Sequence, residues 1–172
     1  MRILPAEQAP DGAVVAGCDG LVIYVDTREK AHAIKNILAH FKKAGAEIIR
    51  QKLDVGDYML SPDGKISVDR KQNLGEVAVN LGKDRFRFSK ECQRAKANGV
   101  QLVILVEHGG QIKSLEAVSL WKNPRLEVSP YALSGPRIYQ LMKAFESKYG
   151  VQWEFCCKQS TGKKIIEILS RG

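Results

Sequence analysis

The chain has 172 residues, of which 44% are hydrophobic, enough for one domain with its own core, and its four cysteines lack the CxxC spacing of a structural metal site. Lys and Arg number 27 against 19 Asp and Glu, and the net charge of +8 favours an anionic partner such as nucleic acid. No apolar run is long enough to span a bilayer, and residues 1–20 lack the apolar core of a signal peptide. We therefore expect a cytoplasmic protein without disulfides or a membrane partner, with an N-terminal extension over 1–20 and one domain over 21–172.

Strands alternate with helices along the predicted domain. Continuous apolar, β-branched runs predict buried strands, and apolar residues at helical spacing predict helices. The strands are expected at 21–25, 47–53, 100–107 and 151–157, and the helices at 30–43, 73–81, 84–97, 134–148 and 162–169. This order indicates an α/β fold with a central sheet flanked by helices on both faces.

A β-hairpin is predicted within residues 53–72, and it makes the sheet mixed rather than wholly parallel. Its arms flank the sequence SPDG at 61–64, where Pro in second and Gly in fourth position suit a type I turn. Pairing of the arms would bring Asp57 and Asp69 together. Two close carboxylates repel each other unless a cation neutralises them, and Mg²⁺ typically takes one or two carboxylates plus water and phosphate oxygens.

The residues after Asp69 extend this hypothesis. Lys71 should share the face of Asp69, because residues i and i+2 of a strand point to the same side, whereas Arg70 should point away if the strand continues. A cation beside a metal ion can orient a water and offset charge that develops on phosphorus, as phosphodiester hydrolysis requires. A solvated cluster of surface charges would give the same pattern.

Further acids lie where α/β sheets tend to bind ligands. Asp26 and Glu29 follow the first predicted strand, and Glu107 ends the strand at 100–107. Ligand sites in α/β sheets tend to lie beyond the carboxyl ends of strands. These acids therefore favour a functional site over a chance cluster.

The predicted helix at 84–97 carries a basic stripe beside an apolar one. Its cations and their flanking neighbours are Lys83, Arg85, Arg87, Lys90 and Arg94. The stripe suits either an ordinary amphipathic surface helix or contact with a phosphate backbone.

Two apolar features leave alternatives open. Trp121 is expected either to stack on an unpaired base or to anchor a loop. The helix at 134–148 has an apolar face that suits either a homodimer contact or the core of the domain. That face consists of Ile138, Leu141, Met142 and Phe145.

Four motifs carry a resemblance to a known family. They are VDTRE at 25–29, VGDY at 55–58, VDRK at 68–71 and LVILVE at 102–107. In order and spacing they resemble the XPF-type nuclease domain of eukaryotic XPF and Mus proteins, archaeal Hef and small stand-alone phage or bacterial versions. The resemblance implies a restriction-endonuclease-like fold and a Mg²⁺- or Mn²⁺-dependent endonuclease that cuts branched, flap or fork DNA.

The family pattern GDx…ERKxxxD assigns roles by resemblance. The catalytic positions fall on Asp57, Asp69, Arg70 and Lys71, the metal ligands on Asp26, Asp57 and Asp69, and the supporting first-motif pair on Arg28 and Glu29. Asp69 stands where the family usually has Glu. The closing Asp of the pattern falls on Gly75, so either Glu76 replaces it as a ligand or that ligand is absent.

Two other hypotheses remain on the same fold. Loss of the closing ligand would suit a catalytically silent DNA-binding or scaffold subunit, and a sequence-specific restriction-like enzyme is the third possibility. No helix-hairpin-helix module follows residue 169. We therefore expect a stand-alone nuclease, or one that takes its specificity from a protein partner.

Overall fold

The computed structural model describes residues 20–172, so the extension predicted at the N-terminus lies, but for residue 20, outside the described part. The strands are β1 (Val22–Val25), β2 (Glu47–Arg50), β3 (Tyr58–Met59), β4 (Ile66–Lys71), β5 (Gln101–Glu107) and β6 (Gln152–Cys156). The α-helices are α1 (Lys35–Lys43), α2 (Leu74–Leu81), α3 (Arg85–Ala97), α4 (Gly135–Tyr149) and α5 (Thr161–Leu169). Short 3₁₀ helices are η1 (Glu116–Leu120), η2 (Pro124–Glu127) and η3 (Lys158–Ser160).

The strands form one mixed sheet in the order β2-β1-β3-β4-β5-β6. β1 pairs with β2, β4 with β5 and β5 with β6 in parallel, whereas β3 runs antiparallel to both β1 and β4. The hairpin is confirmed: Tyr58 pairs with Val68, and the turn closes where Gly64 N–H donates to the Ser61 carbonyl at 2.9 Å. The mixed sheet predicted from the sequence is therefore confirmed.

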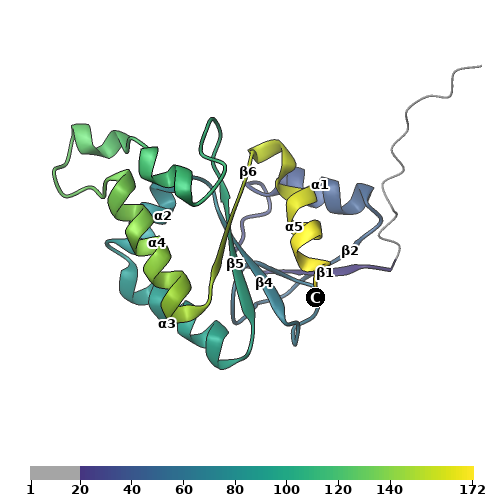
Figure 1. The fold of residues 1–172 in the computed structure, drawn as a ribbon. Coiled ribbons are helices and arrows are strands. Elements are labelled where there is room, and N and C mark those ends of the chain that lie inside the picture. The colour runs from purple at the N-terminus through teal and green to yellow at the C-terminus, as the bar shows by residue number, and fades with distance from the viewer. Residues whose placement is uncertain (1–19) are drawn as a thin grey trace, which may run out of the picture.

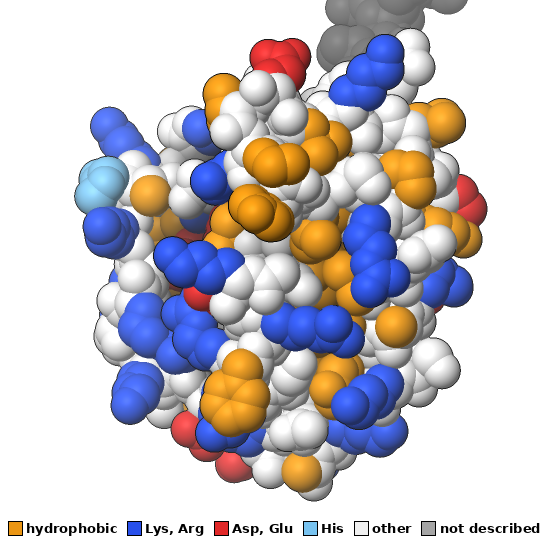
Figure 2. Space-filling model, turned by 90° about the vertical axis from the view of Figure 1, so that its left-hand side faces the viewer, with side chains coloured by type: hydrophobic (Ala, Val, Ile, Leu, Met, Phe, Trp, Pro, Cys, Tyr) orange, Lys and Arg blue, Asp and Glu red, His pale blue; other side chains and the backbone are white. Residues whose placement is uncertain are grey.

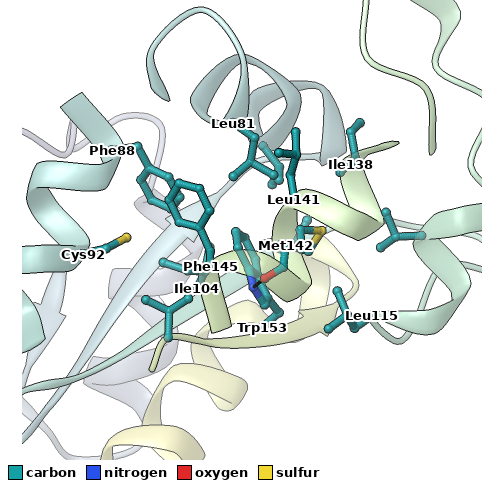
Figure 3. Close-up of a cluster of buried hydrophobic side chains, with 14 of the residues drawn as sticks. Leu81, Phe88, Cys92, Ile104, Leu115, Ile138, Leu141, Met142, Phe145 and Trp153 are labelled. Atoms are coloured by element: carbon teal, nitrogen blue, oxygen red, sulfur yellow. Dashed lines mark hydrogen bonds between the residues drawn. The ribbon is translucent and has the colours of Figure 1, made fainter. Parts of the chain in front are cut away.

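Helices cover both faces of the sheet, as predicted. α1 and α5 lie on one face, and α2, α3 and α4 lie on the other (Figure 1). Each face has its own core of buried hydrophobic side chains. On the α3 and α4 side, the rings of Phe88 and Phe145 stack at 5.3 Å, and the indole N–H of Trp153 donates to the Met142 carbonyl at 3.2 Å (Figure 3).

The apolar face of α4 belongs to this core. Ile138, Leu141, Met142 and Phe145 are each at most 6% exposed. Of the two alternatives for this face, the domain's own core is confirmed, and these four side chains are not free to contact a second copy. Trp121 also packs against the core, edge to face with the His108 ring at 5.8 Å, so it anchors the segment after β5.

Two boundaries differ by several residues from the prediction, and one predicted cap lacks its hydrogen bond. α1 begins at Lys35 rather than at residue 30. Residues 31–34 form turns instead of α-helix, although the buried Ile34 continues the apolar spacing of the helix. β2 ends at Arg50 rather than residue 53, because the backbone N–H of Leu53 turns out of the sheet to the Asp26 carboxylate. Ser134 precedes α4 as expected, but its hydroxyl makes no capping hydrogen bond.

Two further predictions concern membranes and thiols. Within residues 20–172, no helix combines the length and the apolar character needed to cross a bilayer. Cys92, Cys156 and Cys157 are free thiols, and Cys18 lies outside the described residues.

Candidate active site

Asp57 is fixed between two strands by the glycine that precedes it. Gly56 has φ +68°, and a Cβ there would lie 2.2 Å from Ser67 Oγ and 3.0 Å from the Val68 carbonyl. Only glycine tolerates both the positive φ and this close approach. The backbone of Asp57 then donates to the Val68 carbonyl at 2.8 Å and accepts from Asp26 N–H at 2.8 Å. The sequence Val-Gly-Asp thus holds one carboxylate between β1 and β4.

Strand β4 supplies charged side chains to two different faces. It continues to Lys71, so Asp69 and Lys71 share one side and Arg70 points to the other, as strand periodicity predicts. The link to the hairpin is made by the backbone, where Arg70 N–H donates to Asp57 Oδ2 at 2.8 Å. The antiparallel pairing therefore brings Asp57 and Asp69 to the same side of the sheet.

A cleft of about 310 Å³ collects these residues. It is lined by Arg28, Asp57, Asp69, Lys71, Asn80, Arg87, Phe88, Lys90, Glu91 and Arg94. The structure therefore brings the two hairpin acids and Lys71 together with three of the five predicted DNA-binding cations. The other two, Lys83 and Arg85, lie outside the lining of this cleft.

The two hairpin acids repel each other in the cleft. Burial raises the pKa of Asp57 well above its usual range, and the negative charges of Asp69 and Glu29 raise it further. The main counter-charge is the Lys71 ammonium, 2.8 Å from Asp69 Oδ2. Burial alone would lower the pKa of Lys71, but the charge of Asp69 outweighs it and the pKa is raised. Lys71 therefore stays a cation beside the two acids.

Two buried oxygens in the cleft lack hydrogen-bond partners within the described residues. They are Asn80 Oδ1 and Asp69 Oδ2, of which the second forms an ion pair with the Lys71 ammonium at 2.8 Å. Buried polar atoms are nearly always satisfied, so an external group is expected to reach them. A hard divalent cation with its water ligands fits, since such ions bind carboxylate and amide oxygens.

The donor set fits a cation held by two carboxylates. Within residues 20–172, no group of three or more His, Cys, Asp or Glu side chains is arranged to hold a metal ion. Mg²⁺ commonly binds through one or two carboxylates and completes its shell with water and phosphate oxygens. Asp57 and Asp69 meet that smaller requirement.

Arg70 lies in an ionic network on the opposite face of β4. Its guanidinium contacts Glu29 Oε2 at 3.1 Å and Glu107 Oε2 at 3.2 Å, and its side chain is only 4% exposed. Glu107 Oε1 also accepts from the hydroxyl of Thr161 at 2.7 Å, and Glu29 Oε2 accepts from the hydroxyl of Tyr58 at 3.3 Å. This network gives Glu29, which follows β1, and Glu107, which ends β5, a structural role as partners of Arg70. It also keeps the Arg70 side chain out of the cleft lining.

Asp26 is fully engaged by neighbouring donors. Its Oδ1 accepts from the backbone and the Nε of Arg28 at 2.7 and 2.8 Å, and its Oδ2 accepts from Arg28 Nη2 at 2.9 Å and Leu53 N–H at 2.7 Å. Burial would raise the pKa of Asp26, but these hydrogen bonds outweigh it and hold the pKa below its usual value. The partner Arg28 is 58% exposed and reaches the cleft.

Glu76 has a local role at the start of α2. Its Oε2 accepts from Gln72 N–H at 2.8 Å, and its own N–H donates to Asn73 Oδ1 at 3.0 Å. This differs from a capping box in that the Glu76 carboxylate reaches the N–H of Gln72, one residue before the cap Asn73. Glu76 is not among the residues that line the cleft.

Glu91 and Asn80 are site residues that sequence reasoning missed. Glu91 lines the cleft, its Oε1 accepts from Gly56 N–H at 3.1 Å, and burial followed by the charge of Asp69 raises its pKa. A signal existed, because Glu91 lies three residues after the buried Phe88, on the edge of the apolar stripe of α3. Asn80 lies among apolar residues of α2, where a buried amide needs a reason.

The mixed sheet with paired acids on a central hairpin defines an α/β domain of the restriction-endonuclease-like class. The chain belongs to the ERCC4 domain family, whose model matches residues 25–166. A search of curated proteins gave no match.

Two solved structures are similar to this fold. XPF from Aeropyrum pernix is 23% identical, with a TM-score of 0.63, and XPF from Aeropyrum pernix in complex with DNA is 23% identical, with a TM-score of 0.61. Each similarity covers 87% of this chain and 64% of the other, so this chain matches less than two thirds of those proteins. At 23% identity, the structural similarity shows a shared fold.

Proposed function

We propose that this protein is a metal-dependent DNA endonuclease that hydrolyses phosphodiester bonds in branched, flap or fork DNA. The observation that carries the proposal is the cleft that Asp57 and Asp69 line together with Lys71, whose ammonium lies 2.8 Å from Asp69 Oδ2. Membership of the ERCC4 domain family supports it. The similar XPF structure solved with DNA supports nucleic acid as the partner.

Asp57 and Asp69 are the proposed ligands of a Mg²⁺ or Mn²⁺ ion. When bound, such an ion supplies a more acidic water and neutralises charge on the phosphoryl oxygens. Glu91 and Asn80 border the same space and provide acceptors for water molecules in it. Asp26 is not proposed as a ligand, because four donors occupy its oxygens.

Lys71 is proposed to act by charge. Its ammonium stays protonated beside Asp69 and is placed to offset the negative charge that develops on phosphorus. Arg70 is proposed as a positioning residue, since its backbone N–H holds Asp57 while its side chain anchors β4 to Glu29 and Glu107.

The cations of α3 are the proposed phosphate contacts. Arg87, Lys90 and Arg94 line the cleft on the side opposite the sheet, and each is exposed. Arg94 is oriented by a hydrogen bond from Nε to the Asp54 carbonyl at 3.1 Å. Contacts of this kind hold DNA in register without reading its sequence.

A cleavage assay tests the proposal. The wild type is incubated with flap, fork and duplex DNA in Mg²⁺ and in Mn²⁺, beside Asp57→Ala and, as a matched control, Asp63→Ala in the exposed hairpin turn. We expect the wild type and Asp63→Ala to cut branched DNA and Asp57→Ala to be inactive. No cleavage of any substrate, or equal cleavage by all three proteins, would reject the enzymatic function.

One observation favours a second candidate, a catalytically silent DNA-binding or scaffold subunit. Gly75 occupies the position of the family's closing acid, and Glu76 is committed to the start of α2. A protein that binds fork DNA in the same assay but leaves it uncut in both metals would establish this alternative.

A further inference from the structure

A second pocket lies between α2 and the segment that follows η2. Its volume is about 300 Å³. Small residues of α2 and its C-terminal end form one wall, and the segment around Tyr131 forms the other. The walls include Gly75, Ala78, Val79, Gly82, Ala132 and Leu133. The pocket is therefore mainly apolar and has no assigned occupant.

An exposed aromatic ring and two cations border this pocket. Tyr131 is 92% exposed, and on the same segment Val128 is 83% exposed. Lys83 and Arg125 line the pocket beside Tyr131. Figure 2 shows that Lys and Arg side chains are spread over this face, with hydrophobic side chains exposed among them.

This mixture of groups favours a nucleobase over a protein partner. A base has an apolar π-face that stacks on an aromatic ring, and the phosphates on either side of it attract cations. A second copy of the chain would place the same basic face against itself, which the net charge of +8 opposes.

The pocket and the cleft share a helix. Asn80 of α2 lines the cleft, whereas Ala78 and Val79 of the same helix line the pocket. An α-helix with its side chains is only about 10 Å across, so the two sites lie close together. The basic stripe joins them, because Lys83 borders the pocket and Arg87 borders the cleft.

We propose that this pocket binds an unpaired base from a single-stranded DNA arm next to the cleavage cleft. The proposal rests on the proposed function for its choice of DNA, and it deepens that function by naming single-stranded arms as a recognised part of the substrate. Tyr131 is the stacking residue, and Lys83 and Arg125 contact the adjoining phosphates.

The test measures DNA affinity without cleavage. A fluorescein-labelled fork with single-stranded arms and a blunt duplex of the same sequence are titrated by anisotropy in EDTA at fixed salt. The proteins are the wild type, Tyr131→Ala, Tyr131→Phe and Val128→Ala; Val128 is also highly exposed but lies outside the pocket lining. A second fork carries abasic sites in place of the bases of its arms.

We expect Tyr131→Ala to weaken fork binding about tenfold, equivalent to about 1.4 kcal/mol, which is a typical cost of losing one base-stacking contact. Tyr131→Phe and Val128→Ala should bind the fork as the wild type does, and no variant should change duplex affinity. The abasic fork should bind the wild type about tenfold more weakly and show no further loss with Tyr131→Ala.

Three results would overturn the inference. They are unchanged fork affinity in Tyr131→Ala, an equal loss on fork and duplex, and a change of oligomeric state in sedimentation, which would assign the pocket to a second copy. Because binding is measured in EDTA, the proposed function can fail in the cleavage assay while this inference holds. Equally, unchanged fork affinity in a protein that still cuts DNA would reject this inference alone.

Discussion

The two faces of β4 carry the same kinds of side chain in opposite states. On one face, Arg70 makes ion pairs with Glu29 and Glu107, and Glu107 also accepts a hydrogen bond from Thr161. On the other face, Asp69 and Lys71 line the cleft, and a buried oxygen of Asp69 has no hydrogen-bond partner among residues 20–172. Neighbouring residues of one strand thus belong to a hydrogen-bonded ion network and to a cluster in which the Lys71 ammonium faces the two carboxylates of Asp57 and Asp69.

This difference separates structural charges from reactive ones. A buried ion pair whose members are all hydrogen-bonded resists change, because removal of one partner leaves the other charge buried and alone. Charges that are brought together without full compensation, and whose pKa values shift, are typical of functional sites. The presence of Asp, Glu, Arg or Lys on a strand does not distinguish the two cases, whereas the partners of each oxygen do.

The largest effect should come from Asp69→Asn, which changes the side of β4 that faces the cleft. We expect DNA cleavage to fall at least about a hundredfold, because one of two proposed metal ligands is lost. The free energy of unfolding should change less than in Glu107→Gln, because the repulsion from Asp57 disappears together with the attraction to Lys71. Cleavage rates and urea unfolding measure the two quantities.

Glu107→Gln is the matched control on the paired side. It should lower the free energy of unfolding while the folded protein still cuts DNA. If Asp69→Asn destabilised the protein as much as Glu107→Gln does, the two faces would not differ as described.

The next largest effect should come from Arg70→Met, which breaks the paired side. Loss of the guanidinium leaves Glu29 and the buried Glu107 uncompensated, so the free energy of unfolding should fall by about 3–5 kcal/mol. For a chain of this size the fall corresponds to a decrease in Tm of about 10 °C, measured by calorimetry. A variant that kept its Tm and lost all cleavage would instead place the Arg70 side chain in the reaction.

A smaller effect on the same side is expected for Thr161→Val. Thr161 is fully buried and donates to Glu107 Oε1 at 2.7 Å, so its loss should cost about 1–3 kcal/mol of unfolding free energy. Cleavage by the folded protein should stay at the wild-type rate. Ser160→Ala, one residue earlier and less buried, serves as the control and should cost less.

Much of the fold could be predicted because its signals are local. Continuous apolar runs marked β1 and β5, and the SPDG turn marked the hairpin that makes the sheet mixed. The boundaries were less accurate where local patterns compete with tertiary contacts. The strand predicted to reach residue 53 stops at Arg50, because Leu53 N–H is recruited by the carboxylate of Asp26.

The site was only partly predictable, because partners distant in sequence decide which charges stay free. Strand periodicity was enough to predict that the side chains of Arg70 and Lys71 lie on opposite faces of β4. It could not show that Arg28 and Leu53 would occupy every oxygen of Asp26, nor that Glu91 would bond to Gly56 from 35 residues away. Asn80 was overlooked because an amide within an apolar helix carries no local sign of its surroundings.

The most direct test of the central claim is to locate a bound metal ion. Crystals of the protein grown with Mn²⁺ would be measured for anomalous scattering, which identifies the ion by its own signal. We predict a Mn²⁺ peak between Asp57 and Asp69, within reach of Lys71, and none beside Glu29 or Glu107. A peak on the Arg70 side of β4, or no peak in the cleft at a Mn²⁺ concentration that supports cleavage, would contradict the account.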